Sequence, residues 1–246
     1  MIVLGIDVGG SAFKGAPVNT KTGRLLGERH RVEIGSPCPT AQGLAAAREI
    51  VRHFKWRGPV GVGFPSVIMG DRIGAVGNLG DNWEGKNGAV LFSKATGDRV
   101  KLFNDADAAG LAEMRFGAGK GQMGSVLMLT MGTGIGSSLF YRGRLMPNLE
   151  FGHIPWRGKP IERFASAAVR KRARLTWPEW AKRVNTFLAV AERICSPELI
   201  IIGGGVSKKA EKWLKYIKAN AKVVPARMGN DAGIVGAALA WEQAGR

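Results

Sequence analysis

The sequence predicts an α/β protein built from two similar halves around a cleft. Short β-branched runs alternate with longer segments of helical periodicity along the whole chain. A weak internal repeat supports two halves: LGIDVGGSAFKGAPVNTKTGRLL and SVLMLTMGTGIGSSLFYRGRLM each place apolar runs around a glycine turn, followed by a second turn and Arg-Leu. The 246 residues suffice for two modest domains with cores of their own.

The first half predicts a set of strands followed by helices. Strands are expected over 1–8, 11–19, 24–34, 59–65 and 100–106, because these runs are apolar or alternate apolar and polar residues. Residues 41–54 carry Ala, Leu, Ile and Val on one face and predict an amphipathic helix. A second helix is expected over 107–119, where it ends in glycines, with Asp107 as its N-cap.

The second half begins the pattern again. Residues 125–146 predict strand, glycine turn, strand, tight turn and short strand. A long helix is expected over 176–195, a strand and turn over 198–207, a basic helix over 208–221 and a closing helix over 232–244. We expect a small α/β domain over 1–104 plus 233–246 and a larger one over 105–232.

Composition excludes several classes of protein. Hydrophobic residues make up 45% of the chain, which is typical of a globular protein. No apolar run approaches the ~18 residues of a membrane helix, and the N-terminus does not resemble a secretory signal. With two cysteines far apart, Cys38 and Cys195, and three histidines, we expect free thiols, a cytoplasmic location and no zinc site.

The charge balance is unusually basic. The chain has 36 Lys and Arg against 19 Asp and Glu, a formal net charge of +17. Residues 1–123 hold 16 basic and 11 acidic side chains, whereas 124–246 hold 20 and 8, with the densest runs at 170–183 and 208–222. Such a field attracts a polyanion. Charge alone leaves nucleic acid, an anionic membrane and polyphosphate open, with DNA the first expectation.

Three glycine turns follow predicted strands, at 9–10, 132–136 and 203–205. Gly10 to Gly15 has the Walker A spacing, but Ala16 follows where lysine is needed. The last turn fits two positions of the dinucleotide fingerprint, but Lys208 occupies the third. Glycine lets backbone N–H groups converge on an anion. Three such turns therefore favour phosphate binding over the alternative, tight turns between packed strands.

The order of these motifs resembles the actin-like ATPase and sugar kinase superfamily. Asp7-x-Gly-Gly-Ser is similar to its first phosphate motif, Thr130-x-Gly-Thr-Gly-Ile-Gly-Ser to its second, and Gly203-Gly-Gly to its adenosine motif. Within it the chain resembles the ROK family, and there the polyphosphate glucokinases, through NDADAAGLAE, LTMGTGIGS, PNLEFGH and IIGGGVSKKAEKWL. The resemblance runs from Gly5 to Ala240 and implies an actin-like ATPase or ribonuclease H-like fold.

The resemblance also implies a catalytic base and a sugar site. Asp105 matches the family's base; from the residues alone, an N-cap carboxylate is the commoner role before a helix. The implied sugar-binding residues are Asn78, Asn104, Glu150, His153 and Glu162. Carboxylates and amides suit a polyol, because each accepts hydrogen bonds from adjacent hydroxyls. The cysteines of the ROK zinc loop are absent, so no zinc is expected, although Glu162 keeps its place.

The implied donor site uses the glycine turns. Asp7 is expected to face a hydrated Mg²⁺ ion, which explains a carboxylate beside a phosphate loop. The residues implied for donor phosphates are Gly9, Gly10, Ser11, Lys14, Thr130, Gly132, Thr133, Gly134, Gly203, Gly204, Gly205 and Lys208. Mg²⁺ bridges donor phosphates in phosphoryl transfer, while the protein positions the reactants.

The resemblance implies a kinase that transfers the terminal phosphoryl group of polyphosphate, and also of ATP, to the 6-hydroxyl of glucose. It also implies a homodimer. The alternatives are an ATP-dependent kinase of glucose, mannose or another hexose, and a non-catalytic sugar- or polyanion-binding regulator. Specific nucleic-acid binding is disfavoured because the chain starts at the first predicted strand, without a helix-turn-helix domain. Two departures leave the sugar open: Ser66 replaces a family glycine, and IPWRGK follows His153 where acidic residues are usual.

Overall fold

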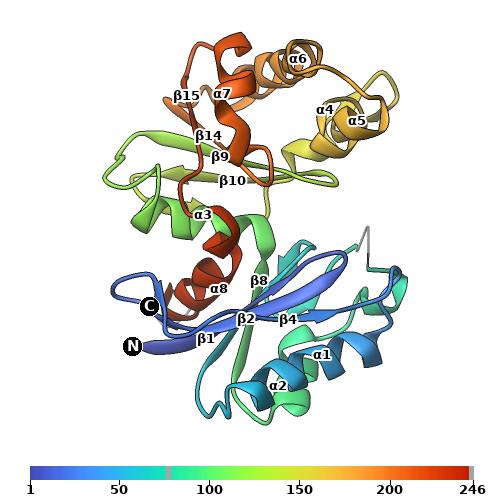
Figure 1. Ribbon diagram of the computed structural model, residues 1–246, viewed down its shortest axis with the longest axis vertical. Helices are drawn as coiled ribbons and strands as arrows, with labels where there is room; N and C mark the ends of the chain where they lie inside the picture. The colour runs from blue at the N-terminus through green and yellow to red at the C-terminus, as the bar shows by residue number, and fades with distance from the viewer. Residues whose placement is uncertain (76–78, 244–246) are drawn as a thin grey trace. The chain divides into compact units, whose positions relative to one another are not determined.

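The computed structural model describes residues 1–75 and 79–243 of the chain (Figure 1). It divides into two compact units. The first comprises Met1–Ala112 with Asp231–Arg246, and the second comprises Glu113–Asn230. The helix α3 (Asp105–Phe116) contributes residues to both units. Among the described residues, no helix combines the length and apolar character needed to span a bilayer.

The first unit is built on a mixed sheet with the order β3-β2-β1-β5-β8. β1 and β2 form an antiparallel hairpin, whereas β1, β5 and β8 run parallel to one another. A small hairpin, β6 (Ile68–Met69) and β7 (Arg72–Ile73), stands outside this sheet. The strands of the main sheet are β1 (Ile2–Val8), β2 (Ala12–Asn19), β3 (Arg24–Leu25), β4 (His30–Glu33), β5 (Val60–Phe64) and β8 (Val100–Asn104). Four of the five strands predicted in this half are confirmed.

The prediction of one continuous strand over 24–34 is wrong. Two short strands stand there, β3 paired with Val18 and Asn19, and β4 paired with the other end of β2. Pro17 lies between the two pairings, and its carbonyl accepts a hydrogen bond from Leu26 N–H. Because proline has no N–H to return, the ladder is interrupted at this point. The chain leaves the sheet over 26–29 and carries Arg29 with it.

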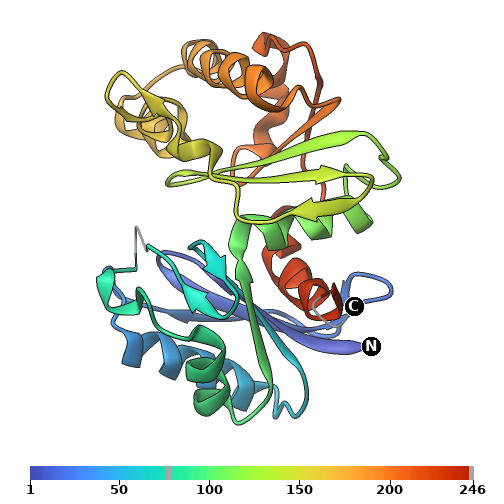
Figure 2. The ribbon, with the colours of Figure 1, turned by 180° about the vertical axis from the view of Figure 1, so that it is seen from behind.

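Helices cover both faces of the first sheet (Figures 1 and 2). α1 (Thr40–His53) and α2 (Gly88–Thr96) lie on one face, and α8 (Ala232–Gln243) lies on the other. α1 and α8 were predicted, whereas α2 was not. α8 approaches so closely that its backbone occupies the space of a side chain at Gly5 and Gly61. Aromatic packing fills the opposite face, where Phe13, Phe64, Trp83 and Phe92 are fully buried.

The second unit repeats the topology of the first. Its sheet has the order β11-β10-β9-β14-β15. With β4 set aside, because it pairs only with β2, both units place the third strand first, then the second, first, fourth and fifth. The first three strands are again antiparallel, and the last two again run parallel to the first. The strands are β9 (Ser125–Met131), β10 (Ile135–Tyr141), β11 (Arg144–Met146), β14 (Leu199–Gly203) and β15 (Lys222–Pro225). The internal repeat predicted from the sequence is therefore confirmed.

The helices of the second unit pack around two buried tryptophans. The long predicted helix is confirmed as α6 (Trp177–Cys195), which begins with a capping box between Thr176 and Glu179. Its Trp180 packs edge-on against Trp213, with ring centroids 5.9 Å apart. The remaining elements before α6 are η2 (Phe151–His153), the hairpin β12 (Pro155–Trp156) and β13 (Lys159–Pro160), α4 (Glu162–Ala165) and α5 (Ala167–Arg172).

The prediction of one basic helix over 208–221 is wrong. The segment forms η3 (Ser207–Lys209), α7 (Ala210–Trp213) and η4 (Leu214–Tyr216). A continuous helix would align lysines three and four residues apart, and like charges at these spacings destabilise a helix. Tertiary contacts stabilise the shorter turns instead: the Trp213 indole donates to the Val206 carbonyl, and Asn185 Oδ1 accepts from Lys218 N–H.

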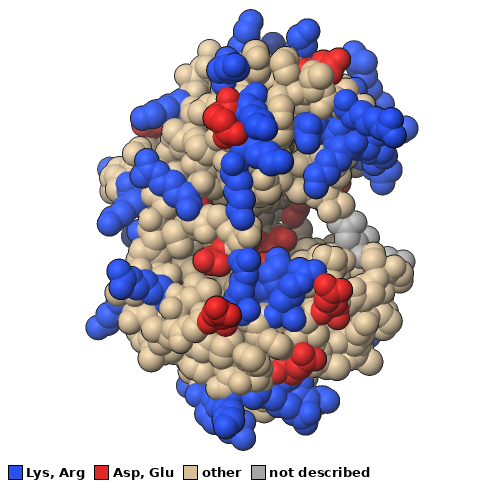
Figure 3. Space-filling view, viewed as in Figure 1, with Lys and Arg blue, Asp and Glu red and all other residues tan. Residues whose placement is uncertain are grey.

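Most of the positive charge belongs to the second unit. Its residues 113–230 contain 21 Lys and Arg and 7 Asp and Glu, a net charge of +14, which leaves +3 for the first unit. On the face drawn in Figure 3, the basic side chains gather most densely over the region of α4 and α5, at the upper right. The polyanion expected from composition would therefore meet this unit's field first.

Candidate active site

The first glycine turn joins β1 to β2 and holds Asp7 near its end. Asp7 pairs with Lys14 across the hairpin, and the Lys14 Nζ lies 3.4 Å from Asp7 Oδ2. The Gly9 N–H donates to the Ala12 carbonyl at 3.0 Å and so closes the turn. This leaves the exposed Gly10 and its neighbour at position 11 as the part of the turn that can meet an anion.

Asp7 is packed against the first turn of α8. Its side chain is only 19% exposed, and a Cβ placed on Gly233 would lie 2.7 Å from the Asp7 Cγ. Burial raises the pKa of Asp7, while the positive charges of Lys14 and, less strongly, Arg29 oppose the rise. The carboxylate is thus a confined oxygen ligand whose space depends on glycine at position 233.

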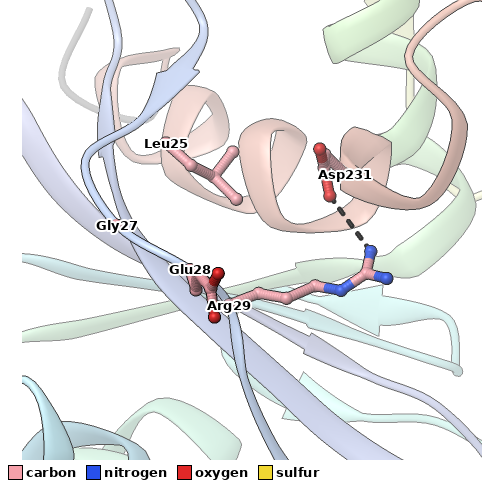
Figure 4. A pocket seen from close by; sticks show the side chains of 5 residues that line it. All are labelled: Leu25, Gly27, Glu28, Arg29 and Asp231. Atoms are coloured by element: carbon pink, nitrogen blue, oxygen red, sulfur yellow. Dashed lines mark hydrogen bonds and ion pairs between the residues drawn. The ribbon is translucent and has the colours of Figure 1, made fainter.

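Arg29 is a residue that sequence reasoning missed. It lies in the interruption between β3 and β4, and its Nη1 is 3.1 Å from Asp231 Oδ1, just before α8 begins (Figure 4). A pocket opens here, lined by Leu25, Gly27, Glu28, Arg29 and Asp231. Since the Arg29 charge also acts on Asp7, this pocket belongs to the surroundings of the first glycine turn. The prediction of one continuous strand over 24–34 gave no reason to consider Arg29 as a site residue.

Asn104 and Asp105 stand where β8 ends and α3 begins. The Asn104 Oδ1 accepts from the Asp107 N–H at 2.9 Å, and its Nδ2 donates to the Ser66 carbonyl at 3.1 Å. Asn104 is therefore the N-cap, and the prediction of Asp107 as cap is wrong, because the helix begins two residues earlier than expected. The cap leaves Asp105 at the first helical position, where its Oδ1 accepts from the Ala106 N–H at 2.8 Å.

The other sugar-binding candidate of the first unit, Asn78, lies outside the described residues. The segment before it returns to the neighbourhood of Asn104, because the Ser66 hydroxyl donates to the Ala75 carbonyl at 3.0 Å. Ser66, the residue that departs from the family pattern, thus contacts both Asn104 and the segment leading toward position 78.

In the second unit, His153 lies between two carboxylates. Its Nδ1 is 3.4 Å from Glu150 Oε2, and its Nε2 is 3.9 Å from Glu162 Oε1. The short helix η2 places Glu150 and His153 on either side of one turn, and the start of α4 supplies Glu162. The structure therefore brings together all three candidates of this unit, with the imidazole 60% exposed. Two carboxylates beside an imidazole can accept hydrogen bonds from neighbouring hydroxyls of a polyol.

Glu162 also supports the second glycine turn. Its Oε2 accepts from the Ile135 N–H at 3.0 Å, directly after the turn. The carboxylate occupies the space that a side chain at Gly134 would need. The sugar-site candidate and the phosphate-loop candidate are therefore in contact within one unit, which sequence spacing alone did not indicate.

The second and third glycine turns lie side by side. Gly132 N–H donates to the Gly134 carbonyl at 3.0 Å, as Gly9 does to Ala12 in the first unit. Thr130 pairs with Gly203 across β9 and β14, and Gly204 packs on the Met131 carbonyl. The sheet thus brings together the donor candidates Thr130, Gly132, Thr133, Gly134, Gly203, Gly204 and Gly205, with exposed Lys208 following in η3.

Glu150 is expected to give the protein a pH-dependent stability. Burial raises its pKa, with His153 opposing the rise and Glu162 adding to it. The pKa of Glu150 is higher in the folded protein than in the unfolded chain. The protonated carboxyl therefore favours the folded state at acid pH, and this stabilisation is lost as the pH rises through the folded-state pKa. Glu150→Gln is therefore expected to raise the melting temperature by about 2 °C at neutral pH. Circular dichroism melts should show this gain in melting temperature vanish at about pH 4. A gain that does not depend on pH would show that it does not come from the ionisation of Glu150.

Comparison with family models adds an independent finding to this geometry. Residues 3–161 match the model described as "ROK family". Among curated proteins, a polyphosphate glucokinase of Mycobacterium tuberculosis is 45% identical over 240 residues, which cover 96% of this chain and 89% of the relative.

Solved structures are similar over nearly the whole chain. The inorganic polyphosphate/ATP-glucomannokinase of Arthrobacter sp. strain KM superposes with a TM-score of 0.95 at 40% identity, covering 99% of each chain. A ROK family glucokinase of Streptomyces griseus, solved with glucose and AMPPNP, gives a TM-score of 0.80 at 25% identity, covering 97% of this chain and 98% of that one.

Proposed function

The chain belongs to the ROK family and has its actin-like ATPase fold, and on this premise we propose that it is a polyphosphate-dependent glucokinase. It transfers the terminal phosphoryl group of inorganic polyphosphate to the 6-hydroxyl of glucose, and it accepts ATP as a second donor. The observation that carries this proposal is the 45% identity, over 96% of the chain, to a protein named polyphosphate glucokinase.

Asp105 is the general base in this proposal. Its carboxylate accepts the proton of the 6-hydroxyl as the oxygen attacks the terminal phosphorus. The cap made by Asn104 and the bond from Ala106 N–H fix the start of α3, so the carboxylate is held without a flexible loop. One amide proton of Asn104 is left beside the bond to Ser66 for a sugar hydroxyl.

Glu150, His153 and Glu162 hold the other hydroxyls of the sugar. Their carboxylate oxygens can accept hydrogen bonds beyond the one that Glu162 receives from the Ile135 N–H, and the exposed imidazole supplies a further donor or acceptor. A sugar that lacks one of these hydroxyls would leave a half-buried carboxylate unpaired, which is the basis for rejecting it.

The donor site fits a divalent cation. Mg²⁺ binds through one or two carboxylates together with substrate phosphates, and Asp7 is one confined carboxylate beside a glycine turn. Asp7 would hold the ion through water, and the bound ion would neutralise charge on the donor phosphates. The positive charges of Lys14 and Arg29 also act on Asp7. The glycine turns contribute their backbone N–H groups.

A donor and acceptor matrix tests the function. Purified protein with Mg²⁺ is incubated with glucose, mannose or fructose and with ATP, tripolyphosphate or long-chain polyphosphate, and the sugar phosphate is measured. We expect glucose 6-phosphate with polyphosphate, a weaker product with ATP, and mannose as the second acceptor. Product with ATP alone would favour an ATP-dependent hexokinase. Tight, sequence-selective binding of duplex DNA without transfer would favour a regulator.

The proposal includes a cytoplasmic homodimer. Both sugar and donor are metabolites of the cell interior, and both cysteines are free thiols. Light scattering coupled to size exclusion should give twice the mass of the 26.3 kDa chain.

A further inference from the structure

A strongly basic surface of the second unit begins at α4 and continues through the turn into α6. Between Glu162 and Glu179 the sequence holds five basic residues and no acidic one. Figure 3 shows the basic side chains crowded over this region. We define the basic strip as Arg170, Lys171, Arg172 and Arg174; the last three are exposed. None of the four forms an ion pair within 1–75 and 79–243, so no carboxylate there compensates their charge.

The basic strip is joined directly to the second glycine turn. The Ala168 N–H, in the first turn of α5, donates to the Gly132 carbonyl at 3.0 Å. Lys171 and Arg172 follow Ala168 by three and four residues, and side chains at these spacings share one helix face. Since α5 has six residues and is about 9 Å long, its first turn contacts the second glycine turn, while Lys171 and Arg172 lie at its far end.

Arg170 is held in a fixed orientation within the strip. Its guanidinium lies 3.9 Å from the Trp177 ring centroid, and its Nη1 donates to the Leu175 carbonyl at 3.1 Å. Stacking and one hydrogen bond immobilise the side chain before any ligand arrives, while its remaining N–H donors are left for an anion. A pre-organised arginine loses less entropy on binding phosphate than a free one.

We propose that the basic strip binds the distal phosphates of an inorganic polyphosphate chain whose reacting end lies at the second glycine turn. This rests on the proposed function, because it supplies the binding surface for that donor. Polyphosphate repeats a negative charge along its length, so each basic side chain of the strip neutralises a further phosphate. The short triphosphate of ATP ends before it reaches the strip, which therefore discriminates long donors from short ones.

The test is the triple variant Lys171→Gln/Arg172→Gln/Arg174→Gln, which keeps Arg170 and its packing. We expect the KM for long-chain polyphosphate to rise about tenfold, because three exposed positive charges that attract the chain are removed. KM values for ATP, tripolyphosphate and glucose should stay the same, as should kcat. The dependence of polyphosphate binding on salt should also become shallower.

A matched variant, Lys215→Gln/Lys218→Gln/Lys222→Gln, removes the same charge elsewhere on the same unit. These lysines are exposed, and the segment that carries Lys215 and Lys218 contacts Asn185 near the middle of α6, away from Trp177. This variant should keep the KM of the parent chain for every donor. An equal rise in the KM for long-chain polyphosphate in both variants would show a general charge effect and would contradict the proposed role of the basic strip.

Direct binding separates this inference from the proposed function. Affinity for labelled polyphosphate is measured on the parent chain and on both triple variants, whose folding is checked by thermal melting. If the parent binds polyphosphate through the basic strip but transfers phosphate only from ATP, the proposed donor is wrong and the proposed binding surface is supported. If the strip variant binds polyphosphate as tightly as the parent, the strip is overturned, whether or not the parent uses this donor.

Discussion

Replacing Asp105 by asparagine is expected to lower kcat by about 10²–10⁴-fold with either donor, because the attacking hydroxyl loses its proton acceptor. The amide oxygen can still accept from the Ala106 N–H, as the carboxylate does at 2.8 Å, so α3 should begin at the same residue. Glucose binding, measured by isothermal titration, should change little, because in the proposed function the sugar is held mainly by Glu150, His153 and Glu162. A kcat near that of the parent chain would remove Asp105 from the mechanism.

The neighbouring position supplies the control for this prediction. Asn104→Ala removes the N-cap bond to Asp107 and the bond to Ser66, so it should cost about 1 kcal/mol of stability or more. Asp105→Asn should leave the melting temperature nearly unchanged. A variant that loses activity without losing stability identifies the base, whereas a matched loss of both would indicate that the helix start has been damaged.

Local sequence patterns predicted the elements that carry these groups. β-branched runs located the strands, and the strand-to-helix junction at Asn104 and Asp105 was predicted within two residues. The predictions failed where tertiary contacts outweigh local preference. The run of lysines after Ser207 resembles a helix, but the buried Trp213 holds it as separate turns. Pro17 belongs to β2 and interrupts the pairing of the neighbouring segment, 24–34. No pattern inside 24–34 shows this.

The site shows the same division. Asp7 stood out as a carboxylate beside a glycine turn, which is a local signal, whereas Glu150 and Glu162 were identified through the resemblance to the ROK family. Neither signal showed that Glu162 occupies the space beside Gly134, because that contact joins two segments far apart in the chain. Gly233 was missed for the same reason. It stands in a helix rich in small residues, and only its contact with Asp7 distinguishes it.

Gly233→Ala is expected to lower kcat/KM about 10²-fold with every donor and to raise the Mg²⁺ concentration required for activity. The new Cβ would lie 2.7 Å from the Asp7 Cγ, so the carboxylate must move, and a displacement of about 1 Å can cost this much. Stability should hardly fall, because the atoms that must move belong to the Asp7 side chain and alanine is a better helix former than glycine. Gly63→Ala is the matched control. Its Cβ meets nothing closer than 3.5 Å, although Gly63 pairs with Asp7, and its activity should persist.

A double-mutant cycle decides whether Gly233 acts through Asp7. Asp7→Asn alone should lose about 10²–10³-fold in kcat/KM, because in the proposed function it removes the carboxylate charge that would face Mg²⁺. If alanine at position 233 harms the reaction only by displacing that carboxylate, adding it to Asp7→Asn should cost little more. Multiplicative losses in the double variant would mean that Gly233 has a role independent of Asp7. Near-complete non-additivity would show that one glycine of α8 sets the position of the carboxylate.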